Sequence, residues 1–180
     1  FTENYIITPE CGGLEIKDFI GLKAANLAEV QKYFGPNITP DWFVITNKVF
    51  KDVLNTEISP ALLSISQIDF KAGTVQNAID LIIKDEGLSF KEKSLFISRL
   101  WESKILPPEV TLLIIDAYED LLKRTRKEKD SEPYLAIRSS SDEEDSEFAA
   151  HAGEFESYLY VKGAGQIVKY LKITWCGLWT

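Results

Sequence analysis

Residues 134–161 constrain the fold of this chain most, because they join two short apolar segments through a long polar connection. The first segment, Tyr134 to Ile137, has the apolar character of a buried strand. The second, Tyr158 to Val161, has the aromatic and β-branched content typical of a strand. Between them the sequence reads Arg138-Ser139-Ser140, an acidic run, and a small-residue loop containing Gly153. The stretch therefore predicts two strands, with an arginine and two serines at the end of the first.

This arrangement of residues suits the binding of a phosphate group. The guanidinium of Arg138 offers a planar set of donors that matches phosphate oxygens, and serine hydroxyls and loop amides add further donors. An arginine at the end of a strand is also commonly a partner in a surface salt bridge. The residue types alone leave both interpretations open.

A second candidate cation, Lys23, lies at or just before the start of a predicted helix over residues 24–33, which Gly35-Pro36-Asn37 ends. Leu27, Val30 and Phe34 are expected to form its inward face. A helix N-terminus attracts anions through its free amides and its dipole. A lysine is mildly unfavourable there, which indicates that Lys23 faces a ligand; a solvated lysine is the alternative.

The rest of the sequence predicts an α+β domain in which a small sheet packs with several helices. The expected elements are a buried strand at 43–45, a helix capped by Thr46 or Asn47 and reaching about Leu54, and helices at 75–83, 90–101 and 165–179. A longer helix is expected to open at residues 107–109 and to have its C-terminus in the basic stretch 123–129. Ser89 and Glu92 have the spacing of a capping box. The inward stripe predicted for this longer helix is Val110, Leu113, Ile114, Ala117, Leu121 and Leu122.

Composition excludes several classes of function. The chain has 28 acidic and 20 basic residues, which argues against a nucleic-acid partner, since such surfaces need clustered Lys and Arg. No apolar run approaches the length of a membrane span, so no membrane partner is expected. Cys11 and Cys176 have no metal-ligand spacing and are expected to be reduced thiols in the cytoplasm.

The order of these motifs resembles the ATP-binding (PEP/pyruvate-binding, ATP-grasp type) domain of the phosphoenolpyruvate synthase and pyruvate phosphate dikinase family. That family carries A-V-R-S-S-A-T-A-E-D, then F-A-G-Q and E-T-Y-L-N-V. Residues 137–140, Glu144-Asp145, Ala152-Gly153, Glu156 and Tyr158-Leu159 fall in register with this pattern. Residues 21–27 resemble its G-G-K-G-A-N-L, residues 39–46 its V-P-P-G-F-V-I-T, and residues 174–180 its C-W-A-S-L-W-T.

The resemblance implies that residues 1–180 form the first lobe of an ATP-grasp-type domain and are a fragment of a longer multidomain protein. ATP is the implied ligand: Lys23 and Arg138 would hold its phosphates, Ser139 and Ser140 would support them, and the Gly153 loop would close over them. Mg²⁺ is the implied metal, with ligands mainly outside this fragment. Neither a catalytic residue nor a metal ligand is assigned within it.

The parent implied by the resemblance is a phosphotransferase, or kinase, that passes phosphate from ATP to an enzyme histidine and then to an acceptor such as pyruvate. The implied partners are the remaining domains of the parent chain: a second ATP-grasp lobe, a phosphohistidine domain and a possible pyruvate-binding barrel. The acceptor is not readable from these residues, and the fragment alone is expected to be inactive.

Departures from the family pattern support a second hypothesis, a degenerate, non-catalytic regulatory or interaction module on the same scaffold. These departures are Leu22, Ala24, Asp41, Trp42 and His151. His151 is the only histidine, but it stands where the family has phenylalanine and lacks a T-S-H-type motif, so a loop or packing role is favoured over a phosphohistidine. The acidic residues between Asp142 and Glu147 could hold magnesium, although such a run is usually solvated.

Overall fold

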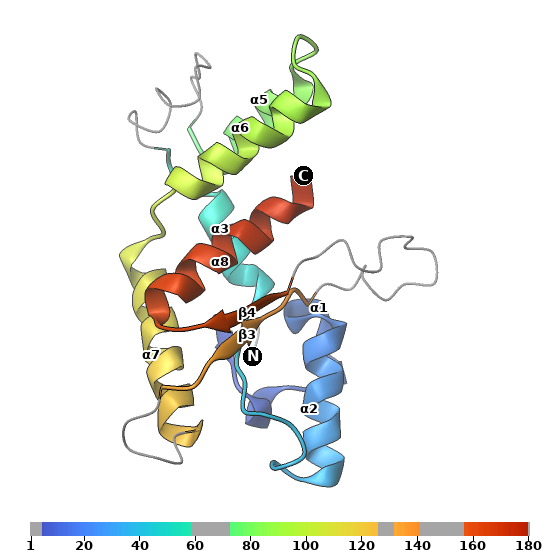
Figure 1. Ribbon diagram of the computed structural model, residues 1–180. Coiled ribbons are helices and arrows are strands. Elements are labelled where there is room, and N and C mark those ends of the chain that lie inside the picture. The colour runs from blue at the N-terminus through green and yellow to red at the C-terminus, as the bar shows by residue number, and fades with distance from the viewer. Residues whose placement is uncertain (1–4, 59–72, 126–131, 141–156, 180) are drawn as a thin grey trace.

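A computed structural model describes residues 5–58, 73–125, 132–140 and 157–179 (Figure 1). The strands are β1 (Ile6–Ile7), β2 (Val44–Ile45), β3 (Leu135–Ile137) and β4 (Tyr158–Val161). The α-helices are α1 (Lys17–Ile20), α2 (Leu22–Phe34), α3 (Asn47–Leu54), α5 (Val75–Lys84), α6 (Phe90–Ser103), α7 (Pro108–Thr125) and α8 (Ala164–Cys176). Short 3-10 helices are η1 (Pro9–Cys11), η2 (Leu14–Ile16) and η3 (Gly177–Trp179). No helix among these described ranges has both the length and the apolar character needed to cross a membrane.

The main core lies where α8 packs against α6 and α7 on one side and the β3–β4 ribbon on the other (Figure 1). Its centre is Trp101, which is 1% exposed. The ring of Trp101 lies 6.0 Å from Phe50, 5.5 Å from Trp175 and 6.1 Å from Trp179, measured between ring centroids. Aromatic rings at these separations add favourable contacts beyond the area they bury. This cluster joins α3, α6, α8 and η3.

The strands form two separate antiparallel pairs. β1 pairs with β2 through Ile6 opposite Ile45, and β3 pairs with β4 through Leu135 opposite Val161. The expected α+β composition is confirmed, but the expected single small sheet is replaced by these two ribbons. The strand expected at residues 134–137 is confirmed as β3 (Leu135–Ile137), but it is not buried as expected, because Ala136 is exposed and Tyr134, just before the strand, is 63% exposed. Because α8 covers only one face of the β3–β4 ribbon, the other face meets solvent.

Helix α2 begins and ends close to its predicted limits, but it packs through a different face. Its buried residues are Ala24, Ala25, Ala28 and Gln31, whereas Val30 is 38% and Phe34 74% exposed. The predicted face of Leu27, Val30 and Phe34 is therefore wrong. Small side chains allow the helix backbone to lie close to α1, η1 and η2, so alanine positions rather than the large apolar ones form the contact.

The remaining helices follow the sequence closely. The capping box at Ser89 is present, because the Ser89 hydroxyl accepts from the amide of Glu92 and the Glu92 carboxylate accepts from the amide of Ser89. In α7 the buried stripe contains Tyr118, which was not predicted, while Leu113 is 38% exposed. The Tyr118 hydroxyl donates to Glu132 and accepts from the amide of Gly163 at 3.0 Å, so it joins α7 to the segment before β3 and to the start of α8.

The start of α3 and the end of α8 differ from what the sequence predicted. Thr46 is the N-cap residue of α3, but its side chain makes no capping hydrogen bond. The expected helix over residues 165–179 ends at Cys176 and continues as the 3-10 helix η3. Leu178, expected on its inward face, is 49% exposed, because the tighter winding of a 3-10 turn rotates its side chains away from the α-helical face.

Two lysines tie the C-terminal end of α6 to its neighbours. The Lys172 ammonium donates to the carbonyls of Glu102 at 2.8 Å and Lys104 at 3.0 Å. The Lys104 ammonium donates to the carbonyl of Glu57 at 3.0 Å. Burial lowers the pKa of both ammonium groups. Cations at this position satisfy carbonyls that the helix leaves unpaired and complement the negative end of its dipole.

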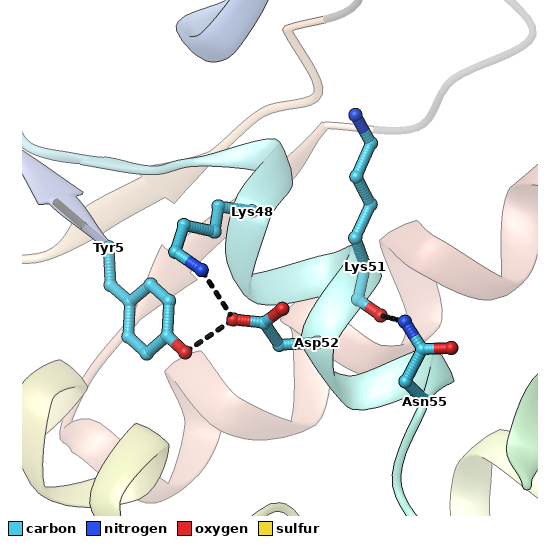
Figure 2. Close-up of polar contacts among 5 residues, drawn as sticks. All are labelled: Tyr5, Lys48, Lys51, Asp52 and Asn55. Carbon is cyan, nitrogen blue, oxygen red and sulfur yellow. Dashed lines mark hydrogen bonds and ion pairs between the residues drawn. The ribbon is translucent and has the colours of Figure 1, made fainter. Parts of the chain in front are cut away.

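A polar cluster beside β1 joins the N-terminal segment to α3 (Figure 2). The Asp52 carboxylate accepts hydrogen bonds from the Tyr5 hydroxyl and from the Lys48 ammonium, the latter at 3.0 Å. The Lys48 nitrogen also lies 5.2 Å from the centroid of the Tyr5 ring. The hydrogen bond from Tyr5 is the largest cause of the lowered pKa of Asp52, and the same bond raises the pKa of Tyr5.

Replacement of Asp52 by asparagine is expected to make stability less dependent on pH at both ends of the range. The folded-state pKa of Asp52 is below its unfolded value, so its contribution is present above the unfolded pKa and is lost as pH falls through the folded pKa. The raised pKa of Tyr5 has the opposite effect: its contribution is complete below its unfolded pKa and is lost as pH rises through the folded pKa.

Urea unfolding of both proteins at several pH values provides the measurement. The Asp52 side chain is 41% exposed, so solvent screening should keep the difference at neutral pH to about 1 kcal/mol or less. This difference should shrink below pH ~4, near the ordinary pKa of an aspartate. A difference that stays constant from neutral to acidic pH would contradict the linkage.

Candidate functional site

The start of α2 and the end of β3 meet in space although they lie far apart in sequence. The hydroxyl oxygen of Ser140 accepts a hydrogen bond from the backbone amide of Ala24 at 3.1 Å. The two residues are separated by 116 positions. Figure 1 shows the end of β3 beside α1 and the first turn of α2. The segments that carry Lys23 and Arg138 are therefore neighbours.

The approach between these two segments depends on Gly21, the N-cap residue of α2. Its backbone has a φ of +77° and a ψ of 161°, a conformation that essentially only glycine adopts. A Cβ built on Gly21 would lie 1.8 Å from the carbonyl oxygen and 2.5 Å from the hydroxyl oxygen of Ser140. No side chain fits in this space, so the contact requires a glycine for both conformational and steric reasons.

The predicted phosphate-binding residues are placed as follows. Lys23 is the second residue of α2 and is half-buried. Arg138 directly follows β3 and is exposed, and Ser139 and Ser140 after it are half-buried. Gly153 lies outside the described residues. The structure thus brings together the backbone around four of the five predicted residues, while their role in binding phosphate stays a prediction.

Two departures from the family pattern, Asp41 and Trp42, contact parts of the chain that are distant in sequence, although the indole nitrogen of Trp42 is buried without a hydrogen-bond partner. The Asp41 carboxylate lies 3.6 Å from the guanidinium of Arg124 at the end of α7, and the same guanidinium donates to the carbonyl of Trp42 at 3.4 Å. The Trp42 ring packs against Gly12, where an added Cβ would approach within 2.9 Å of the ring. These contacts tie the turn to the end of α7 and to Gly12.

A cavity of about 350 Å³ lies beside the C-terminal half of α2. Its lining includes Cys11, Gly12, Ile16, Ala28 and Gln31. Lys23, Arg138 and Ser140 do not line it, so it is separate from the junction between α2 and β3. Cys11 is a free thiol there, and Cys176 is a free thiol in the core.

Within the ranges that the structure describes, no group of three or more His, Cys, Asp or Glu side chains could hold a metal ion. The acidic run from Asp142 to Glu147 and His151 lie outside those ranges. Their alternative roles stay predictions.

Sequence reasoning missed Gly21 and the hydrogen bond between Ser140 and Ala24. The available signal was a glycine two residues before the candidate lysine, at the start of a helix that lacks Ser, Thr, Asp or Asn as its N-cap. The partner of that helix start could not be read locally, because it comes from the other end of the chain.

Comparison with known proteins identifies the family to which the chain belongs. Residues 17–180 match the family described as "Pyruvate phosphate dikinase, AMP/ATP-binding domain". The match covers most of the chain, so the chain belongs to this family, and the resemblance inferred from its motifs is confirmed.

Individual relatives are more specific. The chain is 30% identical over 168 residues to the phosphoenolpyruvate synthase of Aeropyrum pernix, a match that covers 92% of this chain and 18% of the relative. It is 31% identical over 159 residues to the phosphoenolpyruvate synthase of Pyrococcus furiosus, covering 85% of this chain and 18% of the relative. A probable phosphoenolpyruvate synthase of Methanothermobacter thermautotrophicus is 28% identical over 167 residues. The chain thus spans about a fifth of the length of these curated relatives.

Proposed function

We propose that this chain is the ATP-binding part of a phosphoenolpyruvate synthase-like phosphotransferase, and that it forms the first lobe of an ATP-grasp-type clamp. The observation that carries the proposal is the contact between Ser140 and Ala24, which joins the Arg138 segment to the first turn of α2. Membership of an AMP/ATP-binding domain family supports the choice of ligand.

Lys23 and Arg138 would hold the phosphate groups of ATP. Lys23 lies at a helix N-terminus, where backbone amides and the helix dipole favour negative charge. Arg138 follows β3, is exposed, and offers paired donors to phosphate oxygens. Ser139 and Ser140 would support these contacts, and the loop at Gly153 would close over them. The residues present at the junction therefore match the chemistry of a polyphosphate.

Mg²⁺, when bound, would neutralise charge on the phosphates and orient them for transfer. Its ligands are expected mainly outside this chain, and the chain's own contribution would be the two cations and the helix terminus. These groups would orient the terminal phosphate and stabilise the negative charge that spreads over its oxygens during transfer.

The parent protein would transfer phosphate from ATP to a histidine on another domain and from there to an acceptor such as pyruvate. A second ATP-grasp lobe, a phosphohistidine domain and a possible pyruvate-binding barrel would be its further partners, in the cytoplasm. The rival hypothesis, a degenerate module, rests on the five departures from the family pattern. Two of these departures, Asp41 and Trp42, contact Arg124 and Gly12 rather than Ser140 or Ala24, so these two do not by themselves argue against ATP binding.

The 180-residue chain is expected to bind Mg–ATP with a dissociation constant no tighter than about 1 mM, or roughly −4 kcal/mol. Its two cations and hydroxyls would supply phosphate contacts, whereas the contacts to the adenine base would come from the second lobe. The loss of ligand freedom therefore offsets most of what those contacts provide. Calorimetric titration with Mg–ATP measures the constant, and micromolar binding would contradict the half-clamp proposal.

A phosphate-specific signal tests the site itself. In ¹⁵N-labelled chain, adding tripolyphosphate should shift the amide resonances of residues 22–24 and 138–140. The amides of α6, which lies at the other end of the molecule (Figure 1), should stay unchanged. Shifts confined to other surfaces would contradict the assignment of the phosphates to this junction.

A further inference from the structure

We infer that Ser140 serves as the N-cap of α2, supplied from the end of β3, and thereby acts as the positioning residue that sets Lys23 against Arg138. The inference rests on the proposed function of Lys23 and Arg138, and it gives Ser140 a task different from direct support of a phosphate.

The hydrogen bond of Ser140 is the bond that an N-cap side chain normally makes. An N-cap oxygen accepts from the amide of the second or third helical residue. In α2 these residues are Lys23 and Ala24, and the Ser140 hydroxyl oxygen lies 3.1 Å from the Ala24 nitrogen. The true N-cap residue, Gly21, has no side chain to offer and makes no side-chain capping bond.

Gly21 and Ser140 are sterically complementary. A Cβ on Gly21 would lie 2.5 Å from the Ser140 hydroxyl oxygen, so a local capping side chain would occupy the space that Ser140 fills. The carbonyl oxygen of Ser140 would lie still closer, at 1.8 Å from such a Cβ, so a side chain at position 21 would also clash with the backbone of Ser140. The helix start is therefore capped from a distant strand, and the absence of a local cap is what makes room for it.

This arrangement couples the two candidate phosphate-binding segments. Lys23 directly precedes the amide that Ser140 holds, and Arg138 lies two residues before Ser140. If the cap were lost, the first turn of α2 would fray, because its leading amides would have fewer partners. The position of Lys23 relative to Arg138 would then no longer be fixed. The hydroxyl still has its own proton to donate, so capping and a phosphate contact are compatible.

The test compares Ser140→Ala with Ser89→Ala, a matched control in which the lost hydroxyl caps α6 at a remote position. Both variants remove one N-cap hydrogen bond to a helix amide, and Ser89→Ala also removes the bond from its hydroxyl to the Glu92 carboxylate, so the control should lose at least as much stability. Amide hydrogen exchange should accelerate at Ala24 by about fivefold or more in Ser140→Ala alone, as expected for the loss of a capping bond. Ser140→Thr keeps the hydroxyl and should retain the protection of Ala24.

Tripolyphosphate binding is the second measurement, and it is monitored by the amide shifts of residues 22–24 and 138–140. A Ser140 that only stabilised the fold would not change this binding. Ser140→Ala should weaken binding by about fivefold or more, and Ser89→Ala should leave it within about twofold, since a cap matters only at the helix it orders. Equal weakening of tripolyphosphate binding in Ser140→Ala and Ser89→Ala would overturn the inference. Tighter binding in Ser140→Ala would also overturn it, because it would show that Ser140 competes with the anion for the Ala24 amide. Ser140→Thr provides a third outcome that would overturn the inference: it would have to lose as much exchange protection at Ala24 and as much tripolyphosphate binding as Ser140→Ala.

The proposed function and this inference fail differently. If tripolyphosphate shifted no amide resonance at the junction of the unaltered chain, the phosphate site would be contradicted. The hydrogen-exchange rate of the Ala24 amide would still show whether Ser140 caps α2. Unchanged exchange at Ala24 in Ser140→Ala, with phosphate binding intact, would contradict only the role of Ser140.

Discussion

Replacement of Gly21 by alanine is expected to destabilise the chain strongly and to separate α2 from β3. The backbone strain of a non-glycine residue at this φ and ψ costs about 1–3 kcal/mol. The new Cβ would also lie 1.8 Å from the backbone oxygen of Ser140, far inside van der Waals contact. Forcing such overlap typically adds about 1–3 kcal/mol, because the neighbouring backbone must move. Urea unfolding measures the sum.

Gly163 provides a matched control for Gly21. It is the N-cap residue of α8, with a φ of +78° and a ψ of 147°, so alanine there carries a similar strain. A Cβ on Gly163 would meet nothing within 4 Å. Gly163→Ala should therefore cost only the strain, and Gly21→Ala should cost more by the contact with Ser140. Equal losses would contradict the close approach. The junction-specific consequence is faster amide exchange at Ala24 in Gly21→Ala but not in Gly163→Ala.

Replacement of Arg138 by alanine in the full-length parent is expected to lower kcat/KM by about 30-fold to 1,000-fold. Charge-assisted hydrogen bonds to phosphate are among the stronger ones in proteins. Loss of one aimed at charge that develops in the transition state costs about 2–4 kcal/mol. Because Arg138 is exposed and follows β3 rather than packing in the core, its removal should leave the stability of the fold nearly unchanged.

Two further variants show whether geometry or charge alone matters. Arg138→Lys keeps the charge but loses the paired donors, so it should recover only part of the activity. Arg99→Ala removes an exposed arginine from α6, remote from β3 (Figure 1), and should leave kcat/KM unchanged. Activity of Arg138→Ala within about threefold of the parent, equivalent to well under 1 kcal/mol, would reject the proposed role.

The sequence predicted the helices whose own pattern is strong. α5 and α6 follow apolar periodicity, and the capping box at Ser89 marks the start of α6 within one residue. These signals are local, because capping bonds and helical periodicity involve residues three or four positions apart. The family was also predicted from the sequence, since the order of its short motifs is itself a property of the chain.

Predictions that depended on what packs against an element were less successful. The apolar positions of α2 suggested Val30 and Phe34 as its inward face, yet alanines form the contact. In α7, Tyr118 lies inward where Leu113 was expected. The hydroxyl of Tyr118 finds partners at Glu132 and Gly163, and these hydrogen bonds offset the cost of burying its polar end.

The sequence by itself determined that an arginine and serines follow a strand, and that a lysine begins a helix. Each of these depends on residues a few positions apart. Only the tertiary structure decided that the two segments meet, that Gly21 leaves the space for this, and that Ser140 caps a helix 116 positions away. The physical reason is that a long-range contact depends on the packing of every element between its partners. Here it depends on how α8 packs against β3 and β4, and on how the alanines of α2 pack against α1.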